Sequence, residues 1–166
     1  MTLEPPVRVG VLTVSDGVAG GTREDESGAL LVSWAREAGC ELAGREVVPD
    51  ERTAISRVLI GWADEAACDL ILTTGGTGLA SRDVTPEATR DVTERDAPGI
   101  AEALRAAGSA ATPYAALSRG VAAVRGRTLI VNLPGSPGAV RDGIEVLSRI
   151  SEHAVALLRG AATSHD

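Results

Sequence analysis

The chain has 166 residues, 44% of them hydrophobic and 23% charged, which is typical of one globular domain that folds without a disulfide or structural metal. Its 23 acidic and 16 basic residues give a net charge of −7, which argues against the basic patch that nucleic-acid binding needs. No apolar run approaches the roughly 20 residues that cross a bilayer, and no secretory signal is visible, so a cytoplasmic protein without membrane contact is expected.

The first half of the chain alternates between short apolar runs and segments with helical periodicity. Apolar runs that end in turn residues predict buried strands at 7–14, 41–48 and 69–74. Apolar residues at helical spacing predict helices over about 27–39 and 53–66. The glycine-rich segment 17–22 is predicted to be a loop.

The second half begins with a loop that enters a short helix, with Thr85 at the N-cap and Pro86 at the first helical position. A helix at 98–107, a hairpin made of runs 120–124 and 128–133, and a final helix to about residue 158 follow. This order predicts an α/β fold: a three-layer, mostly parallel sheet with helices on both faces and an antiparallel edge hairpin. We expect a single domain over 1–166, with its core at about 7–158.

Polar residues gather at the predicted carboxyl ends of the strands, where ligands bind in an open α/β sheet. Four segments there are the richest in Gly, Ser, Thr, Asp and Asn: 15–21, 49–51, 74–85 and 132–138. Since the carboxyl ends of parallel strands lie at one edge of the sheet, these segments are expected to meet in one crevice.

Three glycines within four residues mark the segment Thr74, Gly75, Gly76, Thr77 and Gly78. Such a backbone can approach a ligand closely, its N–H groups can converge on phosphate oxygens, and the threonine hydroxyls add donors. A tight turn that needs positive φ would use the same residues. The segment is neither a P-loop nor a dinucleotide-binding fingerprint.

A second anion-binding segment is expected at Asn132, Leu133, Gly135 and Ser136, where a strand passes into a helix. Ser136 and the first N–H groups of that helix can bind an anion, and Ser136 can equally act as the N-cap. The two roles are compatible.

Two carboxylates, Asp50 and Asp83, follow strand ends that are expected to be adjacent. Like charges near phosphates are costly unless a cation joins them, and Mg²⁺ takes oxygen ligands from one or two carboxylates plus substrate phosphates. Taken alone, each aspartate is more typical of an N-cap or a solvated turn. Asp16 can contact a ligand or cap a helix, capping is expected for Asp25, and Arg119 is either a phosphate donor or a surface residue.

Two residue types restrict the chemistry further. All 16 basic residues are arginine, so a Schiff-base lysine and a P-loop lysine are excluded, and phosphate chemistry must use backbone N–H groups, arginine or a metal. Cys40 and Cys68 belong to no CxxC pair and are interpreted as small core residues rather than zinc ligands or a disulfide.

Taken together, these segments resemble the molybdopterin adenylyltransferases, the MogA/MoaB-like family that is also found as the G domain of gephyrin. The matching elements lie at 14–16, 49–51, 73–78, 82–89, 98–99, 117–119 and 132–137. Their joint occurrence over nearly the whole chain is far more specific than any one of them.

The resemblance implies that ATP adenylylates molybdopterin, with release of pyrophosphate and with Mg²⁺ as the cofactor. Asp50 and Asp83 match the family's two critical aspartates, Asp83 positioning Mg²⁺–ATP and Asp50 lying near the pterin phosphate. The other residues that it assigns to nucleotide, pterin and phosphate binding are Ser15, Asp16, Thr74, Gly75, Gly76, Thr77, Gly78, Glu87, Ser118, Asn132, Leu133, Gly135 and Ser136.

The same resemblance implies a homotrimer or a hexamer, and a hand-over of the product to a MoeA-like insertase. The alternative is a non-catalytic molybdopterin-binding carrier or scaffold of the same fold. Paired carboxylates argue against the carrier, because a carrier for an anion gains nothing from them unless a metal is present.

Overall fold

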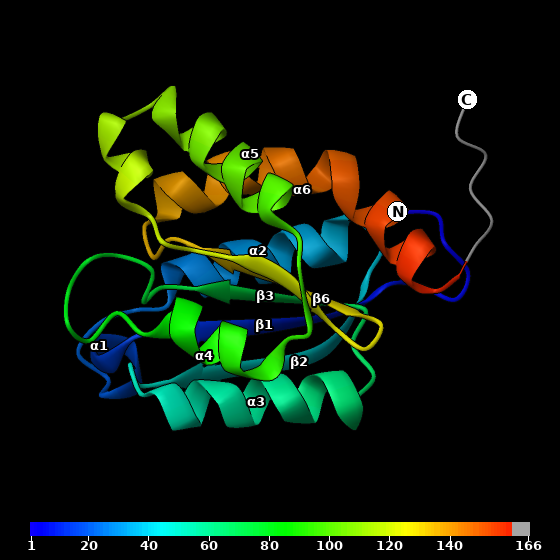
Figure 1. Cartoon of the computed structure of the whole chain (residues 1–166), viewed down its shortest axis with the longest axis horizontal. Coiled ribbons are helices and arrows are strands. Elements are labelled where there is room, and N and C mark those ends of the chain that lie inside the picture. Colours follow the sequence, from blue (N-terminus) through cyan, green and yellow to red (C-terminus); the bar gives the residue numbers. More distant parts are fainter. Residues whose placement is uncertain (161–166) are drawn as a thin grey trace.

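A six-stranded sheet with the strand order β2-β1-β3-β6-β5-β4 forms the centre of the fold in a computed structural model, which describes residues 1–160 (Figure 1). The strands are β1 (Arg8–Val14), β2 (Glu41–Val48), β3 (Leu70–Thr74), β4 (Arg95–Asp96), β5 (Ala122–Arg125) and β6 (Thr128–Leu133). The helices are α1 (Asp16–Ala19), α2 (Glu26–Glu37), α3 (Arg52–Asp64), α4 (Thr85–Val92), α5 (Pro98–Ser109), the 3₁₀ helix η1 (Pro113–Leu117) and α6 (Pro137–Leu158).

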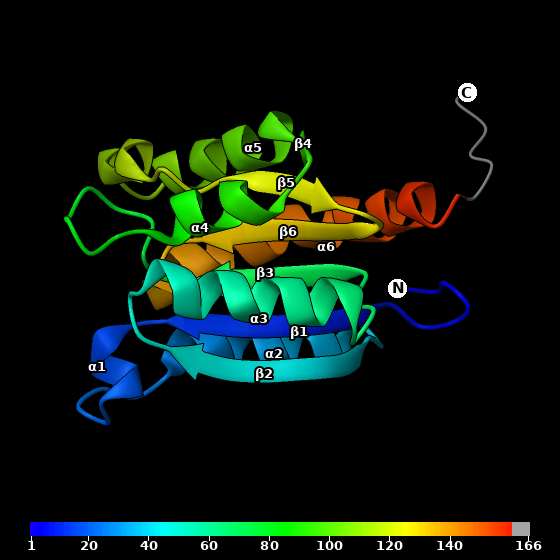
Figure 2. The same ribbon diagram turned by 60° about the horizontal axis from the view of Figure 1, so that its bottom comes forward.

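Helices cover both faces of this sheet, as the alternation of elements predicts. Helices α2, α5 and α6 lie on one face, and α3 and α4 lie on the other (Figures 1 and 2). Each central strand contributes side chains to both hydrophobic cores, because successive side chains point to opposite faces of the sheet. Leu70 and Leu72 pack in the core beneath α2 and α6, whereas Ile71 packs in the core beneath α3 and α4. Within residues 1–160, no helix has both the length and the apolar character needed to span a membrane.

The sheet is mostly parallel, as predicted. β1 pairs in parallel with β2 and β3, and β3 pairs in parallel with β6. The predicted hairpin of β5 and β6 is antiparallel, but it is not the edge of the sheet. The two-residue strand β4 pairs with β5 and forms the edge instead. Its two exposed residues, Arg95 and Asp96, have no apolar alternation that would have indicated a strand.

The structure differs from the predicted elements in three places. The predicted loop after β1 begins with one helical turn, α1, because Ser15 caps it by accepting a hydrogen bond from the Val18 N–H at 3.3 Å. The N-cap of α4 is Val84, not Thr85, whose hydroxyl donates to the Gly75 carbonyl at 2.9 Å. The 3₁₀ helix η1 was not predicted. The caps of α2 and α6 are the predicted Asp25 and Ser136.

Asp69, just before β3, joins three parts of the chain at the end of the sheet opposite the polar segments. Arg159 donates two hydrogen bonds to its carboxylate, at 3.0 and 2.7 Å, and the Arg8 N–H donates a third at 2.8 Å. Burial by itself would raise the pKa of Asp69, but these hydrogen bonds and the two arginine charges hold the pKa below its ordinary value. The ionised carboxylate therefore stabilises the folded state.

We expect Asp69→Asn to lower the free energy of unfolding at pH 7 by about 1–3 kcal/mol, because a charge-assisted hydrogen-bond acceptor is lost. A carboxyl group with a depressed folded-state pKa stabilises the fold above its unfolded pKa of about 3.9, and this contribution disappears as the pH falls through the folded-state pKa. The difference between the variant and the wild type should therefore shrink below about pH 4. Urea unfolding of both proteins at pH 7 and at pH 3.5 measures this difference in the free energy of unfolding. An equal difference at the two pH values would contradict a stabilising role for the ionised Asp69 carboxylate.

Candidate active site

A cavity of about 1050 Å³ opens at the carboxyl ends of β1, β2, β3 and β6, between the N-termini of α2 and α6 and beside η1. It gathers most of the residues that the sequence singled out. Its lining includes Ser15, Asp50, Thr74, Gly75, Gly76, Thr77, Gly78, Asp83, Ser118, Asn132, Gly135 and Ser136. The strand-end segments therefore do meet in one crevice.

The segment 74–78, called the glycine segment below, combines a tight turn with backbone N–H groups that are available to a ligand. Gly75 and Gly76 have φ values of +97° and +66°, and a Cβ atom on Gly75 would lie 2.1 Å from the Val14 carbonyl oxygen. Only glycine fits there without strain. Within residues 1–160, the N–H groups of Gly76, Thr77 and Gly78 have no hydrogen-bond acceptor. Three unused donors beside a cavity are suited to phosphate oxygens.

Two helix N-termini face the same cavity, and they are joined to each other. The Ser27 hydroxyl at the start of α2 donates to the Gly135 carbonyl, just before α6, at 2.7 Å. The Thr74 hydroxyl donates to the Pro134 carbonyl at 2.8 Å and so fixes the segment before α6 against β3. The positive ends of both helix dipoles lie at the cavity wall, which favours an anionic ligand there.

The carboxylates of Asp50 and Asp83 lie beside Gly76 and Gly78, respectively. A Cβ atom on Gly76 would lie 3.1 Å from Asp50 Oδ1, and one on Gly78 would lie 2.8 Å from Asp83 Oδ2. Burial raises the pKa of Asp50; the hydrogen bond from the Asp16 N–H opposes this rise, and the charges of Asp16 and Asp83 add to it. Among the described ion pairs, neither Asp50 nor Asp83 has an arginine partner.

These two carboxylates fit a hard divalent cation better than a metal that needs a complete protein cage. In residues 1–160 no group of three or more His, Cys, Asp or Glu side chains could hold a metal ion. Mg²⁺ is commonly bound by one or two carboxylates, with water and substrate phosphates as the other ligands. The donor set at Asp50 and Asp83 is of this kind.

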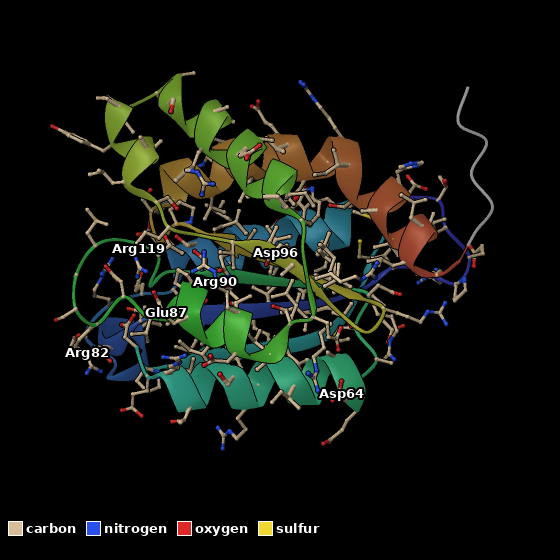
Figure 3. The ribbon with its side chains drawn as sticks, viewed as in Figure 1. Asp64, Arg82, Glu87, Arg90, Asp96 and Arg119 are labelled. Carbon is tan, nitrogen blue, oxygen red and sulfur yellow. The ribbon has the colours of Figure 1, made fainter. Side chains whose placement is uncertain are left out.

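Asp16, Glu87 and Leu133 are predicted site residues that the structure does not place in the cavity wall. The side chain of Leu133 is fully buried in the core. Its carbonyl accepts a hydrogen bond from the Gly75 N–H at 3.1 Å, which holds the glycine segment. The Glu87 carboxylate forms an ion pair with Arg119 (Figure 3). Asp16 forms an ion pair with Arg82. The sequence assigned these residues to ligand binding and did not reveal that their polar groups bind other parts of the protein.

Arg119 forms hydrogen bonds with both ends of the loop that follows the glycine segment. Its Nε donates to the Gly78 carbonyl at 2.7 Å, and its Nη2 donates to the Asp83 carbonyl at 2.6 Å. Its Nη1 donates to Glu87, whose pKa this hydrogen bond lowers. The sequence left open whether Arg119 is a phosphate donor or a free surface side chain. The structure instead has it bound to the loop and outside the cavity lining.

Asn132 and Ser118 also act within the protein. Asn132 is buried, donates to the Thr73 and Thr89 hydroxyls at 2.9 Å each, and accepts the Val121 N–H at 3.2 Å. The Ser118 hydroxyl accepts the Gly120 N–H at 3.3 Å. Both residues line the cavity while they hold β6 and the segment before β5 in place.

Sequence reasoning missed Arg23, Arg105 and Tyr114, which also line the cavity. Tyr114 lies on the unpredicted helix η1, and its side chain is 75% exposed. It is the only tyrosine in a chain that has no phenylalanine, and this rarity of aromatic residues was the one feature of the sequence that could have indicated Tyr114 as a site residue. Arg105 donates to the Ser118 and Gly120 carbonyls at 3.3 and 3.0 Å, and no pattern in the sequence indicated this contact.

Known proteins share this fold and sequence over nearly the whole chain. The family model described as a probable molybdopterin binding domain matches residues 10–153. The molybdenum cofactor synthesis protein cinnamon of Drosophila melanogaster is 42% identical over 154 residues, which are 92% of this chain but 26% of that protein. The molybdopterin adenylyltransferase of Helicobacter pylori J99 is 40% identical over 156 residues, 93% of this chain and 89% of that protein. The crystal structure of the molybdopterin biosynthesis enzyme MoaB from Thermus thermophilus has a TM-score of 0.88 at 50% identity, covering 95% of this chain and 99% of that one.

Proposed function

This chain belongs to the family of molybdopterin-binding domains of molybdenum cofactor biosynthesis, and on that basis we propose that it is a molybdopterin adenylyltransferase. It transfers AMP from ATP to molybdopterin and releases pyrophosphate. The observation that carries the proposal is the placement of two carboxylates without arginine partners among the described ion pairs, Asp50 and Asp83, beside Gly76 and Gly78 of the glycine segment. In the described part of the chain, three N–H groups of that segment have no acceptor. A relative named for this activity matches 93% of the chain, which supports the same conclusion.

The reaction joins two phosphate-bearing substrates, so its main demands are position and charge neutralisation. An oxygen of the terminal phosphate of molybdopterin forms a bond to the α-phosphorus of ATP, and the bond from that phosphorus to the β-phosphate oxygen breaks. The N–H groups of Gly76, Thr77 and Gly78 bind phosphate oxygens, and the N-termini of α2 and α6 favour the same anions. A Mg²⁺ ion held by Asp50 and Asp83 would neutralise phosphate charge.

The remaining features of the proposal come from the family resemblance. The protein acts in the cytoplasm as a single domain that forms homotrimers or hexamers. Its product, the AMP-activated pterin, is chemically primed for metal insertion and passes to a MoeA-like insertase. Sedimentation of the purified chain tests the oligomer independently of the activity.

The proposed function is tested by the release of pyrophosphate from ATP in the presence of Mg²⁺, with and without molybdopterin. Release that depends on molybdopterin, one equivalent for each pterin consumed, is expected. Pyrophosphate release without molybdopterin would indicate a nucleotide hydrolase instead. Tight molybdopterin binding without any release would identify a carrier.

A further inference from the structure

An ion pair between Arg82 and Asp16 connects the loop after the glycine segment to α1. Arg82 donates from Nε to Asp16 Oδ2 at 2.5 Å and from Nη2 to Asp16 Oδ1 at 2.9 Å. Figure 3 shows Arg82 on the side of the molecule where α1 lies. The hydrogen bond from Arg82 is the main reason that the pKa of Asp16 is lowered, so Asp16 is held as a carboxylate.

Asp16 is in turn joined to Asp50 by a reciprocal pair of hydrogen bonds. The Asp16 N–H donates to Asp50 Oδ2 at 2.8 Å, and the Asp50 N–H donates to Asp16 Oδ1 at 3.0 Å. Asp16 Oδ1 therefore accepts from Asp50 and from Arg82 at once. The orientation of the Asp50 carboxylate is set by a residue that Arg82 holds.

Asp83 follows Arg82 directly, so the same ion pair also restrains the second carboxylate. Asp83 Oδ2 accepts the Ala80 N–H at 2.9 Å within the loop. Arg119 binds the base of this loop through the Gly78 and Asp83 carbonyls. The side chain of Leu79 is exposed, so hydrophobic packing does little to hold the outer part of the loop.

We propose that Asp16 and Arg82 are positioning residues whose ion pair sets the separation between Asp50 and Asp83. Neither of them binds substrate in this proposal. Without this ion pair, the outer part of the loop that carries Asp83 loses its contact with Asp16. Asp50 keeps its hydrogen bonds with Asp16, but Asp16 is no longer held by Arg82. The charge of Arg82 also lowers the pKa of Asp50, and so opposes the rise that the charges of Asp16 and Asp83 cause.

The first test is kinetic and rests on the proposed function. We expect Arg82→Gln and Asp16→Asn each to lower kcat by roughly 10- to 100-fold with less than about a threefold change in the KM for ATP, because misplacement by about 1 Å removes transition-state stabilisation. The double variant should be no slower than the slower single variant, since both changes break one bridge. If Arg82→Gln mainly raised KM, and its effect added to that of Asp16→Asn, Arg82 would be a phosphate ligand and the bridge would be refuted.

Arg125→Gln is the matched control. Arg125 makes a similar two-bond contact with Asp64, at 3.0 and 2.6 Å, away from the cavity lining. Figure 3 shows Asp64 well separated from Arg82. This variant should keep the kcat of the wild type, and a loss of kcat equal to that of Arg82→Gln would refute a specific role for the bridge.

The second test is amide hydrogen exchange, which does not depend on activity. In Arg82→Gln, peptides that contain Asp50 and Ala80 should exchange at least about threefold faster than in the wild type, while Arg125→Gln should leave them unchanged. Unchanged exchange in Arg82→Gln would overturn the bridge even if the enzyme is active. If the wild type formed no adduct, the proposed function would fail, and exchange alone would decide on the bridge.

Discussion

Asp83→Asn is expected to lower the rate of adenylyl transfer by roughly 10²–10³-fold or more while the protein stays folded. The substitution removes a carboxylate that lines the cavity and has no arginine partner among the described ion pairs, so the proposed Mg²⁺ loses a charged ligand where phosphate charge must be neutralised. An asparagine oxygen can still accept the Ala80 N–H, which explains why the loop should keep its shape. Single-turnover rates with saturating ATP and Mg²⁺ measure the loss.

Asp64→Asn serves as the control for this experiment, because Asp64 is an exposed carboxylate outside the cavity lining. It should transfer AMP at the wild-type rate. Molybdopterin binding by Asp83→Asn, followed by fluorescence, should remain within about threefold of the wild type. Wild-type turnover in Asp83→Asn would remove Asp83 from the proposed mechanism.

Gly75→Ala is expected to lower the free energy of unfolding by roughly 2–4 kcal/mol and to abolish adenylyl transfer. Alanine is strained at the φ of +97°, and its Cβ would collide with the Val14 carbonyl oxygen at 2.1 Å. The collision involves backbone atoms of β1, so it cannot be relieved by a change of rotamer. Urea unfolding measures the stability, and the release of pyrophosphate measures the activity.

Gly61→Ala is the matched substitution at a site with open space. Gly61 lies in α3, and within residues 1–160 no heavy atom outside the helix backbone lies within 4 Å of the added Cβ. Here alanine should raise the free energy of unfolding by about 0.5–1 kcal/mol, since it favours the helix. If Gly75→Ala were as stable as Gly61→Ala, the close approach of the glycine segment to β1 would not be a constraint on the fold.

The elements that bury apolar side chains were predictable from the sequence. Hydrophobic periodicity indicated β1, β2, β3, β6 and the long helices, because burial and periodicity have the same cause there. Strand β4 and helix η1 could not be found in this way. They are short, mostly exposed segments, and backbone hydrogen bonds define them, such as those of the Glu94 and Ala97 N–H groups to β5.

The location of the candidate site was also predictable, since parallel strands bring their carboxyl ends together. The partners of its side chains were not. Asp16 and Arg82 are 66 positions apart, and Arg119 and Glu87 are 32 apart, so neither pair leaves a local pattern in the sequence. Composition marked these residues as polar and near the site, but tertiary contacts decide which of them remain available to a ligand.

The adenylyltransferase proposal is tested most directly by single-turnover conversion of molybdopterin to its AMP adduct by the purified chain with ATP. The adduct, identified by its mass, should form with Mg²⁺ present and not in the presence of a chelator. Molybdopterin that binds tightly but is recovered unchanged after incubation with ATP and Mg²⁺ would contradict the proposal and identify a carrier.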